Sequence, residues 1–175
     1  MDTNDRILSL RGEVDEKTTG PIIESILQIN DYDYNNSVRD REPIRLHIQS
    51  NGGNVLDAYA LMDIILCSTT PVYTYCDGYV ESSALTIYLA GERRFAYKHS
   101  RFMIHNMASS LSDKTTRNIE DNLIYIKELE EYDMDFLISR TNMDYEYVKN
   151  CLDLHKELFF GSKVALQYGI VTDIL

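Results

Sequence analysis

Apolar and polar residues follow two different periods along this chain, and segments with one period alternate with segments that have the other. Strict alternation is typical of strands, and apolar positions spaced three or four residues apart are typical of helices. Alternating apolar residues predict a strand over 44–49, and the apolar spacing from Val55 onward predicts a helix. The same succession predicts a strand over 72–76 and a buried helix over 83–89. Two consecutive strand–turn–helix units indicate a parallel α/β core.

The chain before these units predicts one more strand and one more helix. A short apolar strand is expected over 6–10, broken by Gly12 and the acidic residues after it. Thr18-Thr19 could cap the helix that follows, with Pro21 in its first turn, where a proline loses no hydrogen bond. Residues 31–42 show no period and are rich in turn formers, so we expect an exposed loop there.

The chain after these units predicts one unusually long helix. We expect it over 115–140, with apolar positions from Ile119 to Ile138, and about 25 residues of helix measure roughly 37 Å, more than the width of a small domain. We therefore expect this helix to project from the body and to pack against a partner, with an amphipathic core helix as the alternative. Shorter elements are expected around it: strands over 94–97 and 102–104, helices over 144–152 and 162–168, a connector or strand over 153–160, and a strand over 170–174.

Composition and charge restrict the class of protein. The chain has 175 residues, of which 44% are hydrophobic and 26% charged, and this suits one soluble globular domain. A net charge of -11 argues against a nucleic-acid-binding surface. We expect no membrane span, and we expect a cytoplasmic location because the start lacks the basic and apolar regions of a signal peptide. The three cysteines lack metal-ligand spacing, so we expect no metal site and no disulfide framework.

Ser82 is the strongest candidate for a nucleophile. It stands between a predicted strand and a predicted buried helix, which fixes its hydroxyl at a sharp bend close to the N–H of Ser83. Hydrolases use such an N–H as half of an oxyanion hole, and the Gly52-Gly53 turn offers a second donor because glycine lets the backbone approach a ligand closely. A plain helix N-cap is the structural alternative for Ser82. The hydroxyl of Ser83 competes for the catalytic role on local grounds.

His105 is the histidine best placed to act as a base. It ends the apolar stretch FMIH, where its ring could face the same end of the sheet as Ser82. A serine needs a neutral imidazole within hydrogen-bond reach to take its proton. His47 would point to the other face of the sheet, and His99 and His155 lie in polar connectors. The alternative is that His105 is only a polar residue that ends the strand.

A carboxylate should orient this imidazole and stabilise its protonated form. The chain has 28 acidic residues, and the pattern alone does not choose among them. Asp153, Asp144 and Glu157 are all consistent with the predicted elements. Gly78 stands four residues before Ser82, so the chain lacks the nucleophile-elbow motif, which argues against an α/β-hydrolase.

Four blocks of the sequence resemble the Clp peptidase family, the proteolytic subunit of the Clp protease. QSNGGNVLDAYALMD resembles the glycine-turn block, CDGYVESSALTIYLAG the nucleophile block, and RFMIHN the histidine block. DLHKELFFGSKVALQYGIVTDIL is similar to the final aspartate, helix and strand. The resemblance runs from about Arg6 to Leu175. It implies the ClpP/crotonase-like α/β fold, with repeated β-β-α units, one domain over 1–175 and a projecting handle helix over about 111–141.

The same resemblance implies an activity and assigns its residues. Carried over by position, it gives Ser82, His105 and Asp153 as a catalytic triad, and the N–H groups of Gly53 and Ser83 as oxyanion donors. Family members hydrolyse peptides inside a chamber built of stacked seven-membered rings, without a metal or another cofactor. The resemblance therefore implies a serine endopeptidase that cleaves peptides or unfolded protein and self-associates as a heptamer or as stacked heptamers. It also implies an AAA+ unfoldase or a paralogous subunit as a partner.

Several positions depart from the family pattern. Glu81 replaces a small residue just before the nucleophile, and residues 108–114 replace a glycine-rich strand that pairs with substrate. Aromatic positions of the ATPase-docking pockets are occupied by Arg45, His47 and Cys67, so we hypothesise that no standard AAA+ unfoldase docks here. These changes motivate an alternative, a catalytically weak or silent ring subunit. An acyl-thioester enzyme of the same fold is a third hypothesis, but it predicts a basic nucleotide-binding surface that the sequence lacks.

Overall fold

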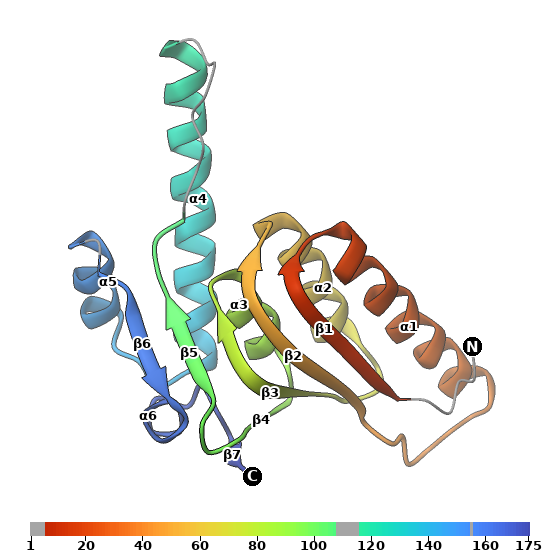
Figure 1. The fold of residues 1–175 in the computed structure, drawn as a ribbon. Helices are drawn as coiled ribbons and strands as arrows, with labels where there is room; N and C mark the ends of the chain where they lie inside the picture. Colours follow the sequence, from red (N-terminus) through yellow and green to blue (C-terminus); the bar gives the residue numbers. More distant parts are fainter. Residues whose placement is uncertain (1–5, 108–115, 155) are drawn as a thin grey trace.

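A sheet flanked by helices forms the body of the protein in the computed structural model (Figure 1). The structure describes residues 6–107, 116–154 and 156–175, and within these residues it contains seven strands and six helices. In chain order these are β1 (Ile7–Val14), α1 (Glu16–Asn35), β2 (Ile44–Gly53), α2 (Val55–Cys67), β3 (Val72–Glu81), α3 (Ser83–Ala90), β4 (Arg93–Ala96), β5 (Arg101–Ile104), α4 (Thr116–Arg140), α5 (Tyr145–Asp153), β6 (Leu158–Gly161), α6 (Ser162–Gln167) and β7 (Asp173–Ile174).

The sheet divides at β3. Its main path runs β1-β2-β3-β4-β7, with all neighbours parallel. The first part of β3 pairs with β4, whereas its last residues, Tyr79 to Glu81, pair with β5. The other edge of β5 pairs with β6, and this pairing is antiparallel. The predicted α/β class is confirmed, and the division brings the ends of β3 and β5 together.

Helices α1, α2 and α3 lie next to one another along β1, β2 and β3 (Figure 1). The alternation predicted for β2 is visible in its burial, because Ile44, Leu46 and Ile48 are fully buried while the residues between them are half-buried. All eight residues of α3 are buried, as its apolar sequence predicts. The core therefore surrounds the helix that begins directly after Ser82.

The N-terminal elements are longer than predicted. β1 continues past Gly12, whose φ of +84° accommodates a shift in strand register, and ends at Val14. α1 begins at Glu16 because the Asp15 side chain accepts a hydrogen bond from the N–H of Thr18, forming a capping box. The predictions of a strand end at Gly12 and of a Thr18-Thr19 cap are therefore wrong. Pro21 lies in the second turn of α1.

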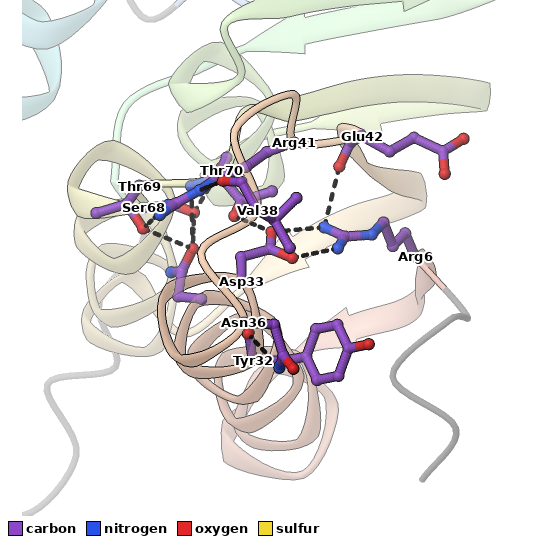
Figure 2. Close-up of polar contacts among 11 residues, drawn as sticks. Arg6, Tyr32, Asp33, Asn36, Val38, Arg41, Glu42, Ser68, Thr69 and Thr70 are labelled. Carbon is purple, nitrogen blue, oxygen red and sulfur yellow. Dashed lines mark hydrogen bonds and ion pairs between the residues drawn. The ribbon is translucent and has the colours of Figure 1, made fainter.

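The end of α1 is held by a buried ion pair that joins distant parts of the chain (Figure 2). Nη1 of Arg6 donates to Oδ2 of Asp33 at 2.9 Å, and the hydroxyl of Thr70 donates to the same carboxylate at 2.7 Å. Arg6 holds the pKa of Asp33 below its ordinary value, so the carboxylate stays charged although it is buried. Asp33 lies inside 31–42, so the prediction of a loop is wrong up to Asn35, where the helix ends.

Helix α4 projects beyond the body, as predicted (Figure 1). The body anchors its C-terminal end: Nε of Arg140 donates to the carbonyl oxygen of Leu89 and Nη2 to that of Gly91, both at 2.9 Å. The expected helix residues 111–115 lie outside the described part of the chain. Leu123 and Ile124 on the projecting part are 46% and 60% exposed. No helix in the described residues is long and apolar enough to cross a membrane.

Candidate active site

Ser82 occupies a strained turn between β3 and α3. Its φ of +55° lies in the left-handed region, which costs a residue with a side chain about 1–2 kcal/mol. The N–H of Ser82 donates to the carbonyl oxygen of Met103 at 3.0 Å, and this bond holds the turn against β5. The hydroxyl makes no capping hydrogen bond to α3 in the described structure, so the N-cap alternative is wrong.

The hydroxyl of Ser82 meets His105 instead. Ser82 Oγ lies 2.7 Å from Nε2 of His105. Strand pairing explains the contact: Glu81 at the end of β3 pairs with Met103 of β5, so Ser82 and His105 follow neighbouring positions at the same edge of the sheet. Residues 23 positions apart thus form the hydrogen bond that a nucleophile and its base require.

The turn after β2 packs directly against the turn that carries Ser82. A Cβ atom on Gly52 would lie only 2.7 Å from Cβ of Ser82, and Gly52 has a φ of +92°. Only glycine allows both this close approach and this backbone conformation without strain. The neighbouring Gly53 donates its N–H to Oγ of Ser83 at 2.8 Å. Gly53 and Ser83 therefore lie beside Ser82, and in this structure the Ser83 hydroxyl accepts the hydrogen bond of the Gly53 N–H.

Asp153, the predicted acid, lies at the end of α5. Its Oδ2 accepts a hydrogen bond from Nζ of Lys149 at 2.9 Å. The two residues are one helical turn apart and form an exposed ion pair. Among the hydrogen bonds of the described residues, none joins Asp153 to His105. The end of α5 nevertheless lies near the base, because the side-chain amide of Asn106 donates to the carbonyl oxygen of Leu152 at 2.8 Å. Asp153 as the third member of the triad stays a prediction.

One cleft of about 1160 Å³ contains the candidate residues. Ser82, His105 and Asp153 all line it, together with the turn at Gly53. Apolar residues of α3 and the C-terminal part of α4 form much of its wall, among them Leu85, Leu89, Met134 and Leu137. A cleft of this volume, with apolar walls and a candidate nucleophile in its lining, suits an extended polymer with apolar side chains.

Sequence reasoning missed one acidic residue in this wall. Asp133 of α4 lines the cleft and accepts a hydrogen bond from the hydroxyl of Thr86 at 3.4 Å. Burial raises the pKa of Asp133 from 3.8 to about 6. A signal was present in the sequence, because Asp133 stands midway between the buried Leu129 and Leu137 at helical spacing. The otherwise apolar face of α4 that packs against the body therefore contains one acidic residue, Asp133.

A serine in a strained strand-to-helix turn, hydrogen-bonded to a histidine at the rim of a cleft, is the arrangement with which hydrolases activate a hydroxyl for acyl transfer. The comparisons with known proteins agree with this class. The family model described as Clp protease matches residues 2–175, and the chain therefore belongs to the Clp protease family.

Two curated relatives are named ATP-dependent Clp protease proteolytic subunit 2. The protein from Treponema denticola is 30% identical over 98% of this chain and 82% of its own length. The one from Treponema pallidum is 28% identical over 97% of this chain and 82% of its own length. A solved ClpP1 variant from Listeria monocytogenes shares the fold, with a TM-score of 0.84 and 24% identity over 99% of this chain and 92% of that one. These relatives support a Clp-type peptidase.

Proposed function

We propose that this protein is a serine endopeptidase in which Ser82 is the nucleophile and His105 the general base. The observation that carries the proposal is the 2.7 Å contact between Ser82 Oγ and His105 Nε2, made at a backbone turn that has no other role for the hydroxyl. The volume and apolar walls of the cleft favour peptides or unfolded protein as substrates.

The geometry supports a two-step acyl transfer. Ser82 Oγ forms a bond to the peptide carbonyl carbon while its proton passes to Nε2 of His105. The N–H groups of Gly53 and Ser83 hold the negative oxygen that develops. The C–N bond then breaks as the imidazolium gives its proton to the leaving amine, and water repeats the sequence to release the acid. The Ser83 hydroxyl must first turn away from the Gly53 N–H, which it occupies in this structure.

We also propose that the chain assembles into rings of the kind that ClpP-family proteins form. The projecting part of α4 carries exposed apolar side chains, including Leu123 and Ile124, that a neighbouring subunit would cover. A ring would enclose the cleft and would limit access to extended chains. Heptamers or stacked heptamers are the expected states.

Substitution of the two adjacent serines tests the proposal. We expect Ser82→Ala to lower hydrolysis of a short fluorogenic peptide by at least about 10³-fold and to abolish labelling by a fluorophosphonate. Ser83→Ala should keep substantial labelling, since it removes only the hydroxyl that occupies the Gly53 N–H. An equal loss in both variants would contradict the assignment of the nucleophile.

A silent ring subunit is the second candidate function. It is favoured by the occupied N–H of Gly53 and by the absence, among the described contacts, of a carboxylate bonded to His105. The same labelling experiment on the assembled protein, with its mass measured by size exclusion, separates the two candidates. Unlabelled protein in intact rings would favour the silent subunit.

A further inference from the structure

The strand that leads to His105 has neighbours on both sides, and both bring polar residues to its end. On one side, Glu81 of β3 pairs with Met103, so Ser82 follows next to the base. On the other side, Ile104 pairs with Leu158, the first residue of the antiparallel β6. Both strands end at this pair, and the same register continued by one step would set His105 opposite Glu157. Strands β3, β5 and β6 therefore present Ser82, His105 and Glu157 in that order across the sheet edge.

The antiparallel register determines which way these side chains lie. Residues directly opposite each other in such a pair have Cα atoms about 4.5–5.5 Å apart and side chains on the same face. Met103 pairs with Phe159, so the alternation along both strands puts His105 and Glu157 on this same face. Nε2 of His105 is engaged by Ser82 on the β3 side. The other ring nitrogen, Nδ1, is then left for a group from the β6 side.

The two acidic candidates differ in their partners. Asp153 forms an ion pair with Lys149 within α5, and its side chain is 62% exposed. Glu157 is exposed, and it forms no ion pair with any residue that the structure describes. The pairing of β5 with β6 determines the position of Glu157, whereas the end of α5 determines that of Asp153. Neither carboxylate is hydrogen-bonded to His105 among the described contacts, and of the two only Asp153 is held in an ion pair.

We propose that Glu157, and not Asp153, is the residue that positions His105. Its carboxylate accepts the hydrogen bond of Nδ1–H, which fixes the tautomer whose Nε2 lone pair faces Ser82 and stabilises the imidazolium that forms when Ser82 is deprotonated. The role rests on the proposed function, because it has meaning only if Ser82 and His105 react. Glu157 directly precedes β6. Its side chain is one methylene longer than that of an aspartate, which suits a contact with a residue at the end of the adjacent strand β5.

Matched amide substitutions of the two acids test this assignment on the full-length protein. We expect Glu157→Gln to lower kcat/KM for the fluorogenic peptide by about 10²- to 10⁴-fold with little change in KM. Asp153→Asn, which tests the competing assignment, should cost at least about tenfold less activity than Glu157→Gln. Glu157→Asp, which keeps the charge, should recover part of the loss. Circular dichroism and size-exclusion mass establish that each variant is folded and assembled.

The pH profile separates positioning from a structural role. A carboxylate beside an imidazole favours the protonated ring, so its removal should move the acid limb of the kcat/KM profile of Glu157→Gln to lower pH, by roughly one unit. Glu157→Asp should keep the parent profile. A large loss in Asp153→Asn, a loss below about fivefold in Glu157→Gln, or an unshifted acid limb would each overturn the assignment. Labelling of the parent protein that survives Ser82→Ala would instead refute the proposed function, whatever the acids do.

Discussion

The two sides of the candidate site are built in different ways. The nucleophile side is part of the core: Ser82 precedes a fully buried helix, rests against Gly52 and is bonded to the backbone of β5. The acid side is peripheral, since Asp153 at the end of α5 and Glu157 just before β6 are both exposed. Packing against the core therefore positions the hydroxyl, whereas the carboxylate depends on the pairing of two four-residue strands. Substitutions on the first side should affect stability and activity together, and those on the second side should affect activity alone.

Gly52→Ala should give the largest combined effect. The new Cβ would lie 2.7 Å from Cβ of Ser82 and 2.9 Å from the carbonyl oxygen of Glu81, at a φ of +92°. We expect the free energy of unfolding to fall by about 2–4 kcal/mol, from overpacking and backbone strain, and activity to fall at least about 100-fold. Urea unfolding and peptide hydrolysis measure the two effects.

Gly20→Ala is the matched control for this substitution. Gly20 lies within α1, and a Cβ there would meet no atom within 4 Å. An alanine in a helix is more stable than a glycine by about 0.5–1 kcal/mol, so this variant should be slightly stabilised and fully active. If Gly52→Ala behaved in the same way, the nucleophile turn would not depend on the core.

Asp133→Asn should give an intermediate effect that depends on pH. Because the folded-state pKa is raised from 3.8 to about 6, the folded chain keeps a proton that the unfolded chain loses between these values. The stability of the parent protein therefore falls as pH rises from about 4 to 6, and Asn, which cannot ionise, escapes this loss. We expect an advantage of about 1–2 kcal/mol for the variant above pH 6, with partial exposure limiting its size.

Thermal unfolding at about pH 4.5 and pH 7.5 measures this difference. Asp135→Asn on the exposed side of the same helix is the matched control for removing a carboxyl group. An equal advantage for Asp133→Asn at both pH values would show that the Asp133 carboxyl does not change its charge in this range.

Lys149→Ala should have the smallest effect. The ion pair that it removes lies on the exposed surface of α5, and such pairs contribute little to stability. We expect the melting temperature to change by about 1 °C or less and activity by less than about twofold. A rise in activity of more than about threefold would mean that Lys149 holds Asp153 away from His105, and it would place the acid on α5 after all.

The sequence alone predicts the parts of this molecule that depend on neighbours along the chain. The strand–turn–helix units around Val55 and Ser83 follow from local periodicity, and the structure confirms both helix starts. The contact of Ser82 with His105 could be predicted because each residue ends a strand of a parallel sheet.

The parts that depend on distant pairs could not be predicted. The last turns of α1 depend on the bond between Asp33 and Arg6, which are 27 residues apart and which no period connects. The carboxylate of the site is ambiguous for the same reason. Our proposal of Glu157 among the 28 acidic residues rests on the register of β5 against β6, and a sequence does not reveal register.

The positive φ of Ser82 determines when the backbone strain at this turn is introduced. Helix α3 is enclosed on all sides, so the turn cannot relax by shifting the helix that follows it. The distortion is therefore introduced once, as the chain folds, and persists through every turnover. If Ser82 is the nucleophile, as we propose, a substrate that enters the cleft meets a hydroxyl that is already oriented. Only the Ser83 hydroxyl and the exposed acid then have to reorganise on binding.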